Sequence, residues 1–220
     1  MPPDSAVGVH ALLRLRSLDD VDWEVRRPEW AQAALQRAPW VVVRRALHPA
    51  CVWPVGVRGR LRGERCAAWL PDRAVAECVT PQLLAASRAW HRPYQGERRN
   101  PALTVLDEVA AIFTAHGHDG RWGPVGSVGF ELATAVPSTT PSSDLDLVLQ
   151  ADEALTRSDA VRLHTELSRL PVRMDVLVET PLGAVALADY AAAPAATLLR
   201  TAHGPRLVCD PWTAATARLA

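Results

Sequence analysis

The sequence contains no lysine, and all 24 of its basic residues are arginine. This absence excludes Schiff-base catalysis, the lysine of phosphate-binding P-loops and the strand lysine of protein kinases. Any bound phosphate must therefore be held by arginine, backbone N–H groups, hydroxyl groups or a metal ion. The net charge is zero, because 24 acidic residues balance the arginines. A dedicated surface for nucleic acid is therefore not expected.

Paired cysteines and long apolar runs are missing as well. The four cysteines are widely spaced and form no Cys-x-x-Cys pair, so neither a zinc site nor a disulfide framework is expected, and free thiols predict a cytoplasmic protein. The first residues lack the basic and apolar regions of a signal peptide. The longest apolar stretch, 185–199, is interrupted by Asp189 and Pro194. No segment is therefore predicted to cross a membrane.

The charges are divided unevenly along the chain. Residues 1–100 hold 16 arginines and 10 acidic residues, a net charge of +6, whereas residues 101–220 hold 8 and 14, a net charge of −6. A polar segment with two prolines and a glycine, 91–101, lies between the halves and resembles a linker. We therefore predict a small, basic N-terminal α/β domain over residues 1–100, linker included, and a catalytic domain over residues 101–220. Four arginines cluster within the basic half: Arg58, Arg60, Arg62 and Arg65.

Apolar patterning and turn residues predict a mixed α/β (α+β) fold. In the first half the sequence predicts a helix over 28–36, strands over 40–43, 51–57 and 65–70, and a helix over 80–89. In the second half it predicts a helix over 103–116, a strand and glycine turn within 122–134, a strand over 145–149, a helix over 158–170, strands over 172–178 and 184–187, and a final helix over 189–200.

Three aspartates stand beside predicted strands of the second half. Asp144 and Asp146 are two residues apart, so a strand directs both carboxylates to one face. Asp175, in the strand after the helix, is expected to complete the group. Crowded carboxylates repel one another unless a cation lies between them, and an all-oxygen site suits Mg²⁺ better than Zn²⁺. We predict these three residues to be catalytic and metal-binding, the alternative being an accidental acidic strand edge.

Several further residues are candidates for binding a substrate. Gly126 and Ser127 form a turn where the backbone and a hydroxyl group can approach a phosphate, and Glu131 follows it at a position suited to sugar hydroxyls or to ordering a metal ion. Three arginines are candidates for binding phosphate, against a plain surface role: Arg173, Arg200 and Arg206. A second Asp-x-Asp pair, Asp20 and Asp22, lies in a polar turn and is expected to be solvated.

The order Gly-Ser, Asp-x-Asp and a later single Asp resembles nucleotidyltransferases of the polymerase β type, although the sixteen residues between Ser127 and Asp144 exceed their usual spacing. Segments 122–134, 143–147 and 179–187 resemble more closely the phosphoribosyl-dephospho-CoA transferases, or holo-acyl-carrier-protein synthases, of the malonate decarboxylase system. Shorter segments also resemble this family: 40–45, 54–59, 199–201 and 204–208.

This resemblance implies a polymerase β-like C-terminal domain and a defined reaction. The donor is triphosphoribosyl-dephospho-CoA, the acceptor is a serine of the apo acyl carrier protein of malonate decarboxylase, and pyrophosphate is released. Two Mg²⁺ ions are expected at Asp144, Asp146 and Asp175, and the basic half is expected to bind the carrier protein. Two alternatives remain: a general nucleotidyltransferase acting on a small molecule or protein, and a non-catalytic relative that binds nucleotide or carrier protein.

Overall fold

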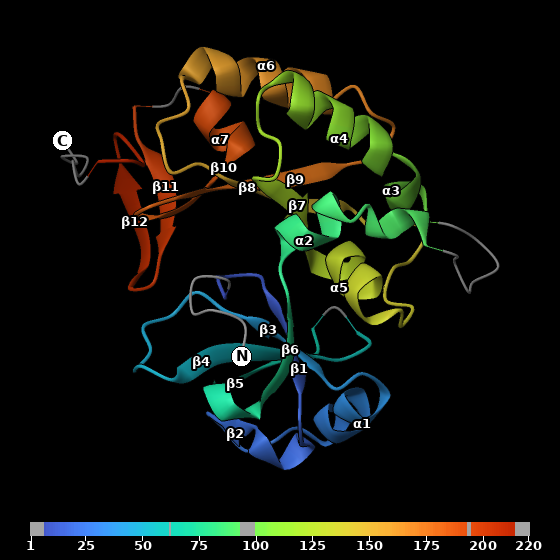
Figure 1. Ribbon diagram of the computed structural model, residues 1–220. Coiled ribbons are helices and arrows are strands. Elements are labelled where there is room, and N and C mark those ends of the chain that lie inside the picture. The colour runs from blue at the N-terminus through green and yellow to red at the C-terminus, as the bar shows by residue number, and fades with distance from the viewer. Residues whose placement is uncertain (1–6, 62, 93–99, 193–194, 214–220) are drawn as a thin grey trace. The chain divides into compact units, whose positions relative to one another are not determined.

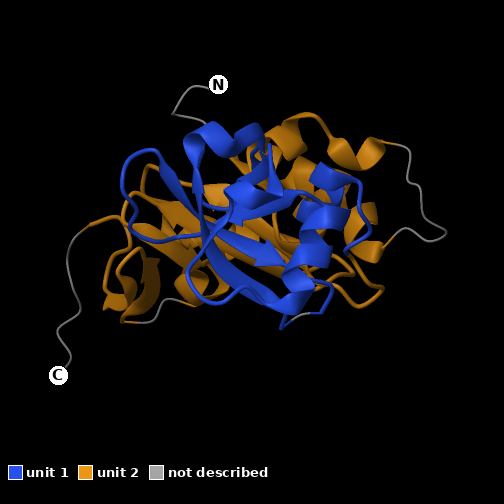
Figure 2. Cartoon of the chain, turned by 90° about the horizontal axis from the view of Figure 1, so that it is seen from below, with its two compact units in different colours: residues 1–80, 130–138 blue, residues 81–129, 139–220 orange. Residues whose placement is uncertain are grey.

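The computed structural model describes residues 7–61, 63–92, 100–192 and 195–213 (Figure 1). The chain divides into two compact units (Figure 2). Unit 1 comprises Met1–Thr80 and Phe130–Ser138, and unit 2 comprises Pro81–Gly129 and Thr139–Ala220. Both units contain helices and strands, which confirms the α+β class. Most of the expected linker, 93–99, and Arg62 of the basic cluster lie outside the described residues.

Unit 1 is built on an antiparallel sheet with the strand order β2-β5-β4-β3-β1-β6. Its strands are β1 (Leu12–Leu15), β2 (Asp22–Trp23), β3 (Trp40–Val43), β4 (Val52–Arg58), β5 (Arg65–Pro71) and β6 (Val75–Val79), and helix α1 spans Glu29–Arg37. The three strands predicted for this half match β3, β4 and β5 closely. Alternating apolar residues of the unit 1 strands form the core, where Leu13 of β1, Val55 of β4 and Leu70 of β5 are fully buried.

Unit 2 contains a second sheet, with the order β12-β11-β10-β9-β8-β7. Its strands are β7 (Trp122–Pro124), β8 (Leu145–Gln150), β9 (Met174–Thr180), β10 (Gly183–Ala186), β11 (Thr197–Thr201) and β12 (Gly204–Val208). Its helices are α2 (Pro81–Ala86), α3 (Pro101–Thr104), α4 (Leu106–Ala115), α6 (Arg157–Leu167) and α7 (Leu187–Ala191), and α5 (Gly126–Thr134) continues into the part assigned to unit 1. Strands β8 and β9 run parallel, and the other pairs of this sheet are antiparallel.

Helices α4, α6 and α7 cover one face of the unit 2 sheet (Figure 1). Every second residue of β8 is fully buried, namely Leu145, Leu147 and Leu149, as expected where a strand packs beneath helices. The rings of Phe113 and Trp122 stack with centroids 4.8 Å apart. Among the described residues, no helix combines the length and apolar character needed to cross a membrane.

One predicted element of the second half was wrong over most of its length, and two others differ in detail. The final helix ends at Ala191, and the residues expected to continue it form β11, because Thr197–Thr201 pairs with β12 along its whole length. The strand expected within 122–134 is β7, which is three residues long, and the glycine turn expected after it is the first turn of α5. The strand expected over 172–178 is β9, which begins and ends two residues later, so Asp175 is its second residue.

The two compact units meet in the sequence between Thr80 and Pro81 and not at the polar segment 91–101, because the units are defined by contacts within the folded chain. Residues 81–92 belong to unit 2, because α2 packs against β7. Gly123 in β7 lies directly against the backbone of Pro81, so a side chain at this position would collide with α2. The domain boundary near residue 100 stays a prediction.

Candidate active site

The parallel pairing of β8 and β9 places Asp146 directly beside Asp175. Each residue is the second of its strand, and parallel neighbours that start at one edge of a sheet bring equivalent positions together. Asp175 is well exposed, with 59% of its side-chain surface accessible. The structure therefore brings together two of the three predicted carboxylates.

Asp144 precedes β8, and an arginine connects it with Asp175. The Nε atom of Arg173 lies 4.0 Å from Oδ2 of Asp144, and an Nη atom of Arg173 lies 4.0 Å from Oδ2 of Asp175. The backbone supports this placement, because Leu145 N–H donates to the Arg173 carbonyl at 2.9 Å. The Arg173 side chain is 74% exposed, so it can turn away from the carboxylates at little cost.

The first turn of α5 packs against the carboxylate of Asp146. Gly126 has a φ of +62°, and a Cβ atom built on it would collide with Oδ2 of Asp146. The N–H group of Val125 donates to the Asp146 carbonyl at 2.9 Å, which fixes the strand beside the helix start. Ser127 follows at 8% exposure. Glycine is required here both by the backbone conformation and by the space.

A buried asparagine also supports the site, and the sequence interpretation missed it. Asn100 is 5% exposed; its Oδ1 accepts from Ala102 N–H at 2.7 Å and caps α3, while its Nδ2 donates to the Thr140 carbonyl. Thr140 N–H in turn donates to the Ser143 hydroxyl at 2.9 Å, immediately before Asp144. The Asn100-Pro101 sequence is a typical helix start and was a detectable signal.

The strand register places the other two candidate arginines, Arg200 and Arg206, on opposite faces of the unit 2 sheet. Glu179 in β9 lies opposite Ala184, and Ala184 lies opposite Arg200. Because directly paired residues share a face and alternate residues of a strand do too, Arg200 lies on the face that carries Asp146 and Asp175. Arg206 is paired with Leu199, the residue next to Arg200 in β11. Because neighbouring residues of a strand point to opposite faces, Arg206 lies on the face opposite to the aspartates.

Glu131 lies in the part of α5 assigned to unit 1 and is 5% exposed. Its Oε2 atom accepts a hydrogen bond from Ser138 N–H at 2.7 Å. The side chain thereby holds the segment that follows α5. Its role toward sugar hydroxyls or a metal ion stays a prediction.

The residues around Asp146 suit a hard cation in their chemistry. Carboxylate oxygens are the ligands that Mg²⁺ prefers, and the missing side chain of Gly126 makes the space that the Asp146 carboxylate occupies. Within the described ranges, however, no three histidine, cysteine, aspartate or glutamate side chains are gathered in a metal-binding group. Arg173 supplies the positive charge between Asp144 and Asp175 in this arrangement.

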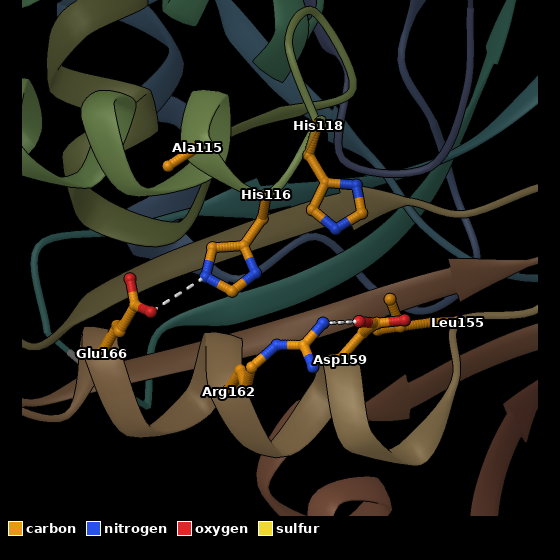
Figure 3. A pocket seen from close by; sticks show the side chains of 7 residues that line it. All are labelled: Ala115, His116, His118, Leu155, Asp159, Arg162 and Glu166. Atoms are coloured by element: carbon orange, nitrogen blue, oxygen red, sulfur yellow. Dashed lines mark hydrogen bonds and ion pairs between the residues drawn. The ribbon is translucent and has the colours of Figure 1, made fainter.

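A separate cavity of about 440 Å³ lies between the end of α4 and α6 (Figure 3). Its charged groups are paired within the protein: His116 Nε2 lies 3.3 Å from Oε1 of Glu166, and Arg162 is paired with Asp159. Burial, followed by the neighbouring His116 and Arg121, holds the pKa of His118 below its usual value. The cavity belongs to the helical layer of unit 2 and not to the aspartate pair.

A parallel strand pair with adjacent aspartates, an exposed arginine and a glycine–serine helix start is typical of enzymes that bind phosphate-bearing substrates. Two family models match the chain: the N-terminal domain of the phosphoribosyl-dephospho-CoA transferase MdcG over residues 8–81, and its C-terminal domain over residues 85–211. The chain therefore belongs to the phosphoribosyl-dephospho-CoA transferase family and is a transferase.

Curated relatives extend over most of the chain. A phosphoribosyl-dephospho-CoA transferase of Azotobacter vinelandii is 39% identical over 209 residues, covering 92% of this chain and 93% of its own. One from Pseudomonas putida is 39% identical over 185 residues, covering 84% and 86%, and one from Klebsiella pneumoniae is 37% identical over 184 residues, covering 83% and 86%. No solved structure matches significantly.

Proposed function

We propose that the chain transfers the phosphoribosyl-dephospho-CoA group from triphosphoribosyl-dephospho-CoA to a serine hydroxyl of the apo acyl carrier protein of malonate decarboxylase, with release of pyrophosphate. The observation that carries this proposal is the pairing of Asp146 with Asp175 beside Gly126. The names of the relatives support the choice of the transferred group. We place the reaction in the cytoplasm on the sequence grounds given above.

In this reaction the serine oxygen attacks the phosphorus atom nearest the donor's ribose. A new P–O bond to the serine forms, the bond from this phosphorus to the oxygen bridging to the next phosphate breaks, and pyrophosphate leaves with that oxygen. The serine proton is transferred to Asp175 or to solvent. Asp175 is suited to receive it, because its carboxylate is exposed and lies beside Asp146.

The start of α5 is proposed to bind the donor's triphosphate. Backbone N–H groups at the first turn of a helix are free to bind an anion, and the hydroxyl group of Ser127 adds a further donor. Gly126 lets the chain approach both the phosphate and Asp146, since it carries no side chain. Together these groups orient the reacting phosphate toward the aspartates.

Asp144, Asp146 and Asp175 are proposed to hold two Mg²⁺ ions, the number that the family resemblance implies. Bound Mg²⁺ supplies positive charge to the phosphates and lowers the pKa of a coordinated hydroxyl group. Arg173 lies 4.0 Å from the carboxylates of both Asp144 and Asp175, and we propose that it turns from them to the donor's phosphates. The positive charge of Arg173 thereby offsets the negative charge of the carboxylates before the donor binds and that of the phosphates afterwards.

The test is to incubate the purified protein and apo carrier protein with Mg²⁺ and either triphosphoribosyl-dephospho-CoA or ATP. Intact mass spectrometry identifies the group added to the carrier, and a coupled assay detects pyrophosphate. A mass increase equal to phosphoribosyl-dephospho-CoA supports the proposal. Addition of AMP from ATP would support a general nucleotidyltransferase, and binding without any transfer would support a non-catalytic relative.

A further inference from the structure

The β11–β12 hairpin at the end of the unit 2 sheet presents an exposed apolar pair. Leu198 and Leu207 are directly opposite each other across the two strands and are 42% and 43% exposed. The next outward position along β11 is Arg200, which is exposed and paired with Pro205. One face of the hairpin therefore offers a cation followed by an apolar surface.

This hairpin surface lies on the face of the sheet that carries the aspartates, and two positions between them on this face, Glu179 and Ala184, are buried. From Asp175 the register leads along β9 to Glu179, and then across Ala184 to Arg200. Four residues along a strand and two strand spacings correspond to about 16 Å. A ligand that reaches Arg200 and the leucines from Asp175 must be elongated, with an anionic group near its middle and a less polar end.

The group transferred in the proposed function has this chemistry. Starting at the reacting phosphate, phosphoribosyl-dephospho-CoA continues through two sugars, the second of which bears adenine as a branch, to an internal diphosphate and then to a long pantetheine arm. We propose that the hairpin is the subsite for the dephospho-CoA part of the donor: Arg200 binds the internal diphosphate, and Leu198 and Leu207 pack against the pantetheine arm. The inference rests on the proposed function, since that function supplies the donor.

The exposed side chains of the hairpin suit the two proposed contacts, one with the diphosphate and one with the pantetheine arm. An arginine pairs with a diphosphate through two parallel hydrogen bonds, and the leucines gain stability when an apolar chain removes their surface from water. The charged groups of the cavity at α4 and α6 are already paired with one another. Its arginine, Arg162, already has an acidic partner in Asp159.

The experiment is calorimetric titration of the full chain with two probes, dephospho-CoA and ADP. ADP retains adenosine and a diphosphate but has no pantetheine arm. Arg200→Gln is expected to weaken both probes about tenfold, because both carry the diphosphate. Leu198→Ser and Leu207→Ser are each expected to weaken dephospho-CoA several-fold and to leave ADP binding unchanged.

Matched controls lie on the helical side of the same unit. Val161 on α6 is 45% exposed, and Arg169 follows the same helix at an exposed position. Val161→Ser and Arg169→Gln make the same chemical changes away from the hairpin and are expected to bind both probes as the wild type does. The thermal unfolding temperature of each variant shows whether it folds, and an unfolded leucine variant is replaced by Leu207→Thr, which suits a strand.

Wild-type affinity for dephospho-CoA in all three hairpin variants would overturn the inference. So would unchanged probe affinity together with a raised KM for the carrier protein, because the hairpin would then bind the carrier. The two proposals fail separately: if the wild type transfers the group and the hairpin variants bind normally, only the subsite is wrong. If the wild type binds dephospho-CoA at the hairpin but transfers nothing, the proposed reaction is wrong.

Discussion

The sheets of the two units differ in one kind of strand pairing, and this difference determines where carboxylates can meet. Among the described residues, the strand pairs of unit 1 are antiparallel, whereas unit 2 has the parallel pair β8–β9. Helix α6 returns the chain to the edge where β8 began, so β9 starts beside it. Equivalent positions of successive strands consequently become neighbours only in unit 2.

An Asp-x-Asp sequence occurs in each unit and shows the effect directly. In unit 1, Asp20 ends a short 3-10 turn and Asp22 is paired with Trp69 in an antiparallel strand. In unit 2, Asp146 is paired with Asp175 and lies against Gly126. Only Asp20 therefore lies in the expected turn, because Asp22 belongs to an exposed position of β2. The same local pattern is part of a candidate site in unit 2.

The largest expected effect is the loss of transfer when the Asp146–Asp175 pair is disrupted. Asp146→Asn should reduce transfer to the carrier protein below about a tenth of the wild-type rate, because its carboxylate is central to the proposed metal site. Asp22→Asn makes the same change in the Asp-x-Asp sequence of unit 1 and should retain full transfer. Both variants should keep the wild-type unfolding temperature. Intact mass measured over time gives the rates, and equal activity of the two variants would contradict the assignment.

The next effect concerns the contact between α5 and Asp146. Gly126 and Gly120 have similar positive φ values, +62° and +68°, but a Cβ atom on Gly120 would meet nothing within 4 Å. Gly120→Ala should therefore lower the free energy of unfolding by about 1 kcal/mol through backbone strain alone. Gly126→Ala should lower it by about 2–3 kcal/mol and also slow transfer, because the added methyl group displaces Asp146.

Urea unfolding followed by circular dichroism measures both free energies, and the transfer assay is repeated on each variant. Equal losses of stability in the two variants, with equal transfer, would mean that the contact with Asp146 is not tight. The comparison separates the cost of the left-handed backbone from the cost of the collision, since only Gly126 carries both.

A smaller effect is expected on the KM for the carrier protein when a charge in the basic half of the chain is reversed. Arg58 and Arg65 are paired across β4 and β5, which places the described part of the basic cluster at one hairpin of unit 1. Arg60→Glu should raise the KM for an acidic carrier protein about threefold and reduce its salt dependence, with little change in kcat. Arg169→Glu, in the acidic half, is the matched charge reversal and should leave this KM unchanged. A raised KM for the donor in place of the carrier would assign the cluster to the donor's phosphates.

The smallest expected effect depends on pH. The pKa of His118 is held low in the folded protein, chiefly by burial, so the unfolded chain binds its proton more readily. The free energy of unfolding should therefore be constant above about pH 6.5 and decrease as the pH falls below the unfolded value. His118→Gln should weaken this decrease. Urea unfolding at several pH values measures it, and an identical pH profile in the variant would show that other groups cause the decrease.

The sequence predicted the elements whose signals are local. Trp40–Val43 is a strand as predicted from its β-branched residues, and the apolar run after Asp144 is β8. The sequence failed at 197–201, where a run compatible with a helix pairs with β12 instead. Strand formation there depends on a partner strand, and the identity of a partner is a property of the folded chain.

Residue types and their order along the chain were enough to identify the family, to exclude lysine chemistry and to select the candidate aspartates. The folded chain was needed to show that Asp146 lies beside Asp175 and that Gly126 packs against Asp146. It was also needed to show that Arg200 shares their face of the sheet while Arg206 does not. The physical reason is that residue type and spacing act over a few neighbouring residues, whereas strand order and register are set by burial of apolar faces between segments far apart in the chain.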